Sequence, residues 1–173
     1  TYMGHSFMWN CDAFNHPVTL PQTMTEVPAR FLGDCEEFNS PISIPDHVTV
    51  IGKNFLHNSW KFVDHRITWP SQLKSIGDMF MAGTEYNYPL DFPEGLTDIG
   101  ADFLQGCIYF NSEITLPSTL VSIGKEFLML CYAFDQPLVV PDSVVTIGNH
   151  FMWNCHSYAH SINIPSTVES LYD

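Results

Sequence analysis

Hydrophobic and polar positions follow one pattern along this chain, and the pattern returns about every 24 residues, seven times over. The unit reads I-G-x-x-F-L-x-x-C-x-x-F-N-x-P-I-x-I-P-x-x-V-x-x. Its most regular markers are a Phe and a later Pro, found at Phe7, Phe31, Phe55, Phe80, Phe103, Phe127 and Phe151, and at Pro21, Pro45, Pro70, Pro93, Pro117, Pro141 and Pro165. A fixed period of this length is typical of a solenoid, in which each repeat buries its apolar face against its neighbours.

The repeats predict one continuous solenoid domain over residues 1–173, because no change of composition and no linker divides the chain. The seven repeats are expected at approximately residues 3–26, 27–50, 51–75, 76–98, 99–122, 123–146 and 147–171.

Each repeat contains an apolar–middle–apolar triplet that ends at the marker Pro, as in Ile42, Ser43 and Ile44. This alternation predicts a strand whose flanking side chains point inward and whose middle side chain points outward, and the Pro ends it. A bend should follow the Pro and return two more aliphatic residues to the interior. A Gly then recurs in most copies, as at Gly100 and Gly124, and is expected to supply a backbone conformation that is costly for other residues. Pro28 and Tyr172 replace it in two copies.

The first Phe, a Cys and a second Phe stand at i, i+4 and i+7, as in Phe7, Cys11 and Phe14. This spacing predicts one face of a short helix of about two turns. The predicted fold is therefore an α/β solenoid of the leucine-rich-repeat type, with a parallel β-sheet on one face and short helices on the other.

The repeat unit resembles the BspA-like leucine-rich repeat family, most closely in the strings TLPSTLVSIGKEFLMLC (115–131) and VVPDSVVTIGNHFMWNC (139–155). Family repeats usually carry an Ala before the Phe and a shorter link to the strand, so the F-N-x-P segment marks this chain as a variant. The resemblance implies a non-enzymatic surface or secreted protein that serves adhesion or recognition, at an extracellular or cell-surface location.

The net charge of −13 argues against nucleic acid and against an anionic membrane surface as partners. No apolar stretch is long enough to cross a bilayer, and no signal peptide is visible in a chain that starts at Thr1. The charge is uneven, since residues 53–74 carry four basic residues and a single acid.

The chain offers no support for an enzyme, a metal site or a cofactor. Five Cys occupy one column of the repeat, at Cys11, Cys35, Cys107, Cys131 and Cys155, and no two are close in sequence as metal-binding or redox motifs require. Buried thiols explain this column best, although disulfides between adjacent repeats stay possible. The adjacent Asp64 and His65 have no nucleophile motif nearby.

The outward strand positions form one candidate binding surface for a protein or a glycan: Thr19, Ser43, Thr68, Asp91, Thr115, Val139 and Asn163. Beside them runs a column just before the strand, which includes His65 and Tyr88. Small hydroxyls with His and Tyr suit adaptable hydrogen bonding. The alternative is that Thr and Ser merely suit an exposed strand.

The third repeat forms a second candidate surface, because it is one residue long, the fourth is one short, and both lack the Cys. Within ten residues it holds Trp60, His65, Arg66 and Trp69, residue types that include those enriched in binding hot spots. Drift in a tolerant repeat would explain the same irregularity.

A rival hypothesis is structural. Neither end of the chain shows a polar capping segment, and the string FMWNC recurs at 7–11 and 151–155, six periods apart. Uncapped solenoid ends expose apolar surface and can stack on further repeats or copies of the chain. The chain could therefore be a subunit of an extracellular filament or sheet.

Overall fold

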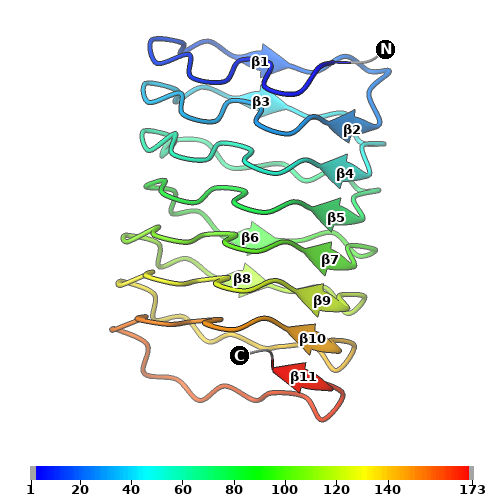
Figure 1. Ribbon diagram of the computed structural model, residues 1–173, viewed down its shortest axis with the longest axis vertical. Helices are drawn as coiled ribbons and strands as arrows, with labels where there is room; N and C mark the ends of the chain where they lie inside the picture. The colour runs from blue at the N-terminus through cyan, green and yellow to red at the C-terminus, as the bar shows by residue number, and fades with distance from the viewer. Residues whose placement is uncertain (1–2, 172–173) are drawn as a thin grey trace.

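The computed structural model describes residues 3–171, and the strands in it are two residues long. The repeats stack as successive turns of one solenoid, which we number coil 1 to coil 7 after the predicted repeats (Figure 1). The strands are β1 Val18–Thr19, β2 Glu26–Val27, β3 Ile42–Ser43, β4 Val50–Ile51, β5 Ser75–Ile76, β6 Leu90–Asp91, β7 Asp98–Ile99, β8 Ile114–Thr115, β9 Ser122–Ile123, β10 Thr146–Ile147 and β11 Ser170–Leu171. All of their pairings are parallel, which confirms a solenoid with parallel strands.

The main sheet lies where the sequence predicts a bend. Seven strands pair in the order β11-β10-β9-β7-β5-β4-β2, along the right of Figure 1, and they come from the segment that follows the marker Pro. The triplet before the Pro forms strands in four repeats only, as the two pairs β1-β3 and β6-β8. Both segments alternate inward and outward side chains, so hydrophobic alternation alone does not say which one pairs continuously.

The predicted helices are wrong, since residues 3–171 contain no helix. The residue before the first Phe and the residue before the Cys column have positive φ in every repeat: Ser6, Arg30, Asn54, Met79, Asp102, Glu126 and His150, and Asn10, Asp34, Asn58, Gly83, Gly106, Leu130 and Asn154. A right-handed helix does not tolerate such residues. In coils 1 to 6 their N–H groups bond instead to the next coil, as Asp102 N donates to the Lys125 carbonyl and Gly106 N to that of Met129, both at 2.8 Å.

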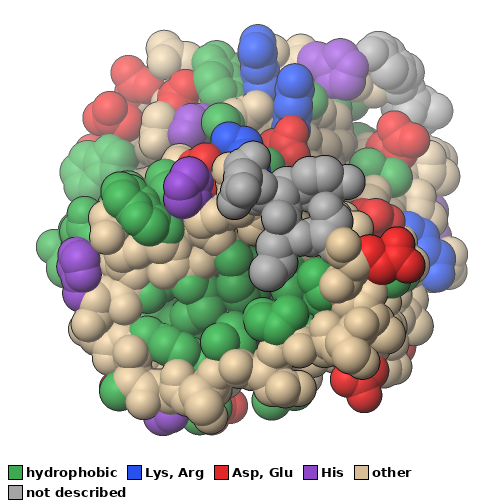
Figure 2. All heavy atoms as spheres, turned by 60° about the horizontal axis from the view of Figure 1, so that its bottom comes forward, with side chains coloured by type: hydrophobic (Ala, Val, Ile, Leu, Met, Phe, Trp, Pro, Cys, Tyr) green, Lys and Arg blue, Asp and Glu red, His purple; other side chains and the backbone are tan. Residues whose placement is uncertain are grey.

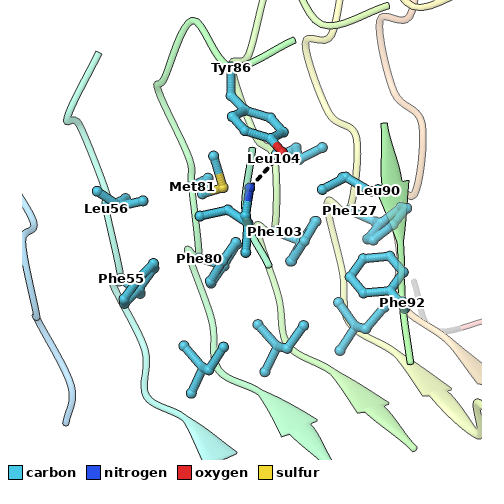
Figure 3. Close-up of a cluster of buried hydrophobic side chains, with 14 of the residues drawn as sticks. Phe55, Leu56, Phe80, Met81, Tyr86, Leu90, Phe92, Phe103, Leu104 and Phe127 are labelled. Carbon is cyan, nitrogen blue, oxygen red and sulfur yellow. Dashed lines mark hydrogen bonds between the residues drawn. The ribbon is translucent and has the colours of Figure 1, made fainter. Parts of the chain in front are cut away.

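The core is filled by columns of aromatic rings, one ring from each coil. The first Phe column stacks from Phe7 to Phe151 with ring centroids 5.1 to 6.3 Å apart and planes within 18° of parallel. Figure 3 shows Phe55, Phe80 and Phe103 of this column, and all three are fully buried. A second column runs through Phe38 and Phe62, with Tyr86 taking the Phe position in coil 4. The Phe columns therefore form the core that the repeat pattern predicts.

The recurring Gly has a different cause from the one expected. Gly52, Gly100 and Gly124 do not have positive φ. A Cβ added at each would lie 2.4 to 2.6 Å from a backbone nitrogen of the preceding coil. The column is thus glycine because adjacent coils approach too closely for a side chain. Tyr172, which replaces this Gly in the last copy, lies outside the described residues.

Candidate functional site

The outward strand positions form a continuous exposed row, which we call the strand row: Thr19, Ser43, Thr68, Asp91, Thr115, Val139 and Asn163. All seven are exposed, and their flanking residues are buried or half-buried in six of the seven coils. In the seventh, Ile164 is exposed beside Asn163. The inward–outward alternation predicted for this segment is therefore confirmed, also in coils where it forms no strand.

An ion pair and a hydrogen bond connect three coils across the strand row. The Arg66 guanidinium donates to one carboxylate oxygen of Asp91, and the Thr115 hydroxyl donates to the other at 3.1 Å. Arg66 and Asp91 are both more than half exposed, so the pair contributes little to stability. Its groups remain within reach of a ligand.

Polar contacts attach the segment of coil 3 around Asp64 and His65 to coil 2. Asp64 accepts a hydrogen bond from the Asn39 amide at 2.6 Å, and the His65 ring lies 3.2 Å from the Asn39 carbonyl oxygen. His65 is half-buried and its ring lies near Phe62. The insertion is thus an ordered part of the surface, and Asp64 and His65 have structural contacts.

The two tryptophans of coil 3 lie in different environments. The Trp60 side chain is 40% exposed, with the Lys61 ammonium 5.2 Å from its ring centre, and Lys61 also pairs with Glu37. Trp69 is half-buried and packs inward against Phe80 and Phe92. The structure therefore leaves Trp60 as a surface residue and makes Trp69 part of the core wall. Tyr88 is also half-buried, with its ring 5.8 Å from that of Tyr86.

Sequence reasoning missed a ladder of amide and carboxylate groups beside the strand row. The Asn15 side-chain oxygen accepts from the Asn39 N–H at 2.9 Å, and the Asn111 oxygen accepts from the Asp135 N–H at 2.8 Å. Each link joins residues 24 apart. The signal was visible in the sequence as the Asn of F-N-x-P, which stands in one column. The ladder fixes the spacing between adjacent coils of the segment that leads into the strand row.

The five Cys form no disulfide bonds, and their thiols have structural roles. The Cys131 and Cys155 thiols donate to the carbonyls of Leu104 and Leu128 in the preceding coil, at 3.2 and 3.1 Å. The Ser59 hydroxyl makes the same bond to Leu32, which explains why Ser replaces Cys in coil 3. Burial raises the pKa of Cys107 to about 11, so this thiol is not a nucleophile near neutral pH.

Within the described part of the chain no group of three or more His, Cys, Asp or Glu side chains is placed to hold a metal ion. One groove, of about 660 Å³, runs along the glycine column, and its lining includes Gly77, Gly100, Ser75, Asp98 and Lys53. Sequence reasoning did not predict this groove, because it depends on how adjacent coils approach.

Both end coils expose apolar side chains that interior coils bury. Phe7 is 48% exposed and Phe151 is half-buried, whereas Phe31 and Phe127 in the same column are fully buried. Figure 2, in which the C-terminal end comes forward, shows hydrophobic side chains gathered in the middle of that face. These apolar side chains lie at both ends of the described part of the chain.

Fold and surface together define a parallel β-solenoid with an exposed, mainly polar strand row. The chain belongs to the family described as "BspA type Leucine rich repeat region (6 copies)", whose model matches residues 1–134 and 65–173.

Two solved structures share the fold. A leucine-rich repeat protein from Bacteroides ovatus is 22% identical with a TM-score of 0.81, over 96% of this chain and 41% of its own. A leucine-rich cell surface protein from Faecalibacterium prausnitzii is 16% identical with a TM-score of 0.52, over 95% of this chain and 57% of its own. The present chain thus spans less than two thirds of either. No curated protein matches it. Residues 3–171 contain no helix that could span a bilayer.

Proposed function

We propose that this chain is a non-catalytic recognition module at a cell surface, which binds a protein or glycan partner through the strand row and the neighbouring surface of coil 3. The observation that carries this proposal is the strand row itself, in which seven exposed side chains stand one per coil on a rigid stack. A surface location is in keeping with the leucine-rich cell surface protein that shares the fold.

The proposed contact surface contains Thr19, Ser43, Thr68, Asp91, Thr115 and Asn163 of the strand row, with Arg66, His65, Tyr88, Trp60 and Trp69 beside it. Arg66 is the strongest candidate, since it is exposed and its guanidinium can exchange Asp91 for a ligand. Trp60 offers a ring to a ligand, whereas Trp69 and Tyr88 would act by supporting the surface from within.

Protein and glycan arrays test this proposal. We expect the wild-type chain to bind a defined set of ligands, and a Trp60→Ala/Arg66→Ala variant to bind them more weakly. Gln22→Ala is the control, because Gln22 is exposed in a turn outside the strand row. Equal binding by both variants would remove coil 3 from the contact surface, and no binding by the wild type would contradict the recognition role.

The exposed end faces favour a second function, in which copies stack end to end into an extracellular filament or sheet. Every interior coil buries its ring between two others, and the end coils lack one partner each. Light scattering against salt and protein concentration tests this assembly. Large particles that grow with concentration support it, and a monomer at high concentration excludes it.

A further inference from the structure

A groove opens on the strand row between coils 5 and 6, with a volume of about 470 Å³. Ile114, Thr115, Leu116 and Ser118 of coil 5 line it together with Pro137, Val139 and Pro141 of coil 6 and Glu94 of coil 4. Its lining is thus largely aliphatic, on a surface that is otherwise polar.

The groove lies where the backbone ladder on this side of the solenoid stops. β6 and β8 are joined by bonds from Leu90 N to the Glu113 carbonyl and from Phe92 N to the Thr115 carbonyl, at 2.9 and 3.3 Å. Among the residues that the structure describes, no backbone hydrogen bond joins 114–116 to 138–140. Side chains, and not a paired backbone, therefore form this part of the surface.

Val139 is the only aliphatic member of the strand row, and its side chain is 77% exposed. The alternation of the fold demands an outward residue here but no apolar one, since the other six are Thr, Ser, Asp or Asn. Its neighbours Leu138 and Val140 are buried and account for the core. An exposed Val beside an aliphatic groove is the arrangement of a contact site for an apolar side chain.

The charge around the groove is mainly acidic. Glu94 lines it, and the exposed Glu113 and Asp142 follow or precede lining residues in the chain. None of the three forms an ion pair within residues 3–171, and the Glu94 carboxylate accepts only from the Ser118 hydroxyl and N–H. One cation is close, since the Lys74 ammonium lies against Gly95. The surroundings therefore complement a cationic partner.

We infer that this groove anchors an extended polypeptide segment of a partner protein, which inserts an aliphatic side chain between coils 5 and 6 and places Lys or Arg beside it. The inference rests on the proposed recognition role and names the partner class. An aliphatic floor favours a polypeptide over a glycan, because no aromatic ring lines the groove for a sugar to stack on. The acidic surroundings select basic flanks.

The test uses a library of random 12-residue peptides displayed on phage and selected on the wild-type chain, with synthetic copies of the selected peptides measured by fluorescence anisotropy. We expect Leu, Ile or Val next to Lys or Arg in these peptides. Their affinity should fall about tenfold or more for Val139→Asp, although the new carboxylate attracts basic peptides. Val121→Asp is the matched control, because Val121 is 41% exposed and lies outside the groove. It should bind as the wild type does.

Three results would overturn the inference. Equal binding to Val139→Asp and wild type would show that the groove is not the contact. Binding lost in Arg66→Ala and kept in Val139→Asp would place the partner elsewhere on the strand row, which contradicts the groove and supports the recognition role. A selection without enriched peptides would exclude a polypeptide segment, and the array experiment would then decide the recognition role by itself. Circular dichroism confirms that each variant is folded.

Discussion

At some positions of this solenoid, the space that the neighbouring coil leaves determines which residue fits. Gly124 has the backbone nitrogen of Ala101 only 2.4 Å from the place of a Cβ, whereas Gly4 in coil 1 has nothing within 4 Å. The same column therefore demands glycine in coils 3 to 7 and not in coils 1 and 2, the second of which holds Pro28. The neighbouring coils also bury Asp102, which stands in a column where the other coils place Ser, Arg, Asn, Met, Glu or His.

Gly124→Ala should lower the free energy of unfolding by about 2 to 3 kcal/mol or more, because the Cβ forces two backbones apart. Gly4→Ala should change it by less than about 0.5 kcal/mol. Urea denaturation of both variants measures the difference. Equal losses would show that the glycine column serves backbone conformation and not space.

Asp102→Asn should stabilise the fold at high pH. The Asp102 side chain is 6% exposed and its Oδ1 has no hydrogen-bond partner. Burial, followed by the neighbouring Glu126 carboxyl, raises the pKa of Asp102 to about 6. Because the folded-state pKa lies above the unfolded value of about 3.9, the contribution of Asp102 to stability is present at low pH and is lost as pH rises through 6.

We therefore expect Asp102→Asn to raise the free energy of unfolding by about 1 to 2 kcal/mol at pH 8 and to change it little at pH 4.5. Asn also suits the positive φ of this position. Denaturation at the two pH values measures the gain, with the exposed Asp142→Asn as control. A gain of equal size at both pH values would contradict the role given to the carboxyl charge.

At the scale of the element, the arc from the first to the second Phe shows that one spacing of apolar residues is compatible with two backbone conformations. Apolar residues at i, i+4 and i+7 match a helix, and they equally match an arc in which left-handed residues interrupt right-handed ones. The column before the Cys distinguishes the two, because it holds Asn, Asp or Gly in six of seven repeats. These are the residues that adopt positive φ most readily.

The Gly106→Ala substitution tests this arc, because a helix and the observed backbone predict changes in stability of opposite sign. In a helix the change would stabilise the chain by about 1 kcal/mol. Gly106 has a φ of 74° and open space around its missing Cβ, so we expect a loss of about 1 kcal/mol from backbone strain alone. Thermal unfolding measures the sign. A raised melting temperature would contradict the observed backbone.

For the whole molecule, every strand pairing within residues 3–171 joins adjacent repeats, so stability should fall from the centre to the ends. The Phe103 ring is buried between the rings of Phe80 and Phe127, whereas Phe7 stacks on one ring and is 48% exposed. The end coils are thus the first to open.

Hydrogen exchange measured by mass spectrometry should show the slowest exchange in coils 3 to 5 and the fastest in coils 1 and 7. Phe103→Ala should cost about 3 to 5 kcal/mol and Phe7→Ala much less. Uniform protection along the stack would mean that the ends are covered in solution, and it would favour the end-to-end assembly.

The sequence by itself determined the period, the parallel stacking, the Phe columns and the outward direction of the strand row, because each follows from repeated alternation that every copy obeys. Only the tertiary structure decided which segment pairs into the continuous sheet, why glycine recurs, and that the Phe–Cys–Phe arc is not helical. Those features depend on hydrogen bonds and distances to the next coil, as at Gly124 and Asp102, and no single repeat contains them. The groove beside Val139 is of the same kind, since it exists only where two coils fail to pair.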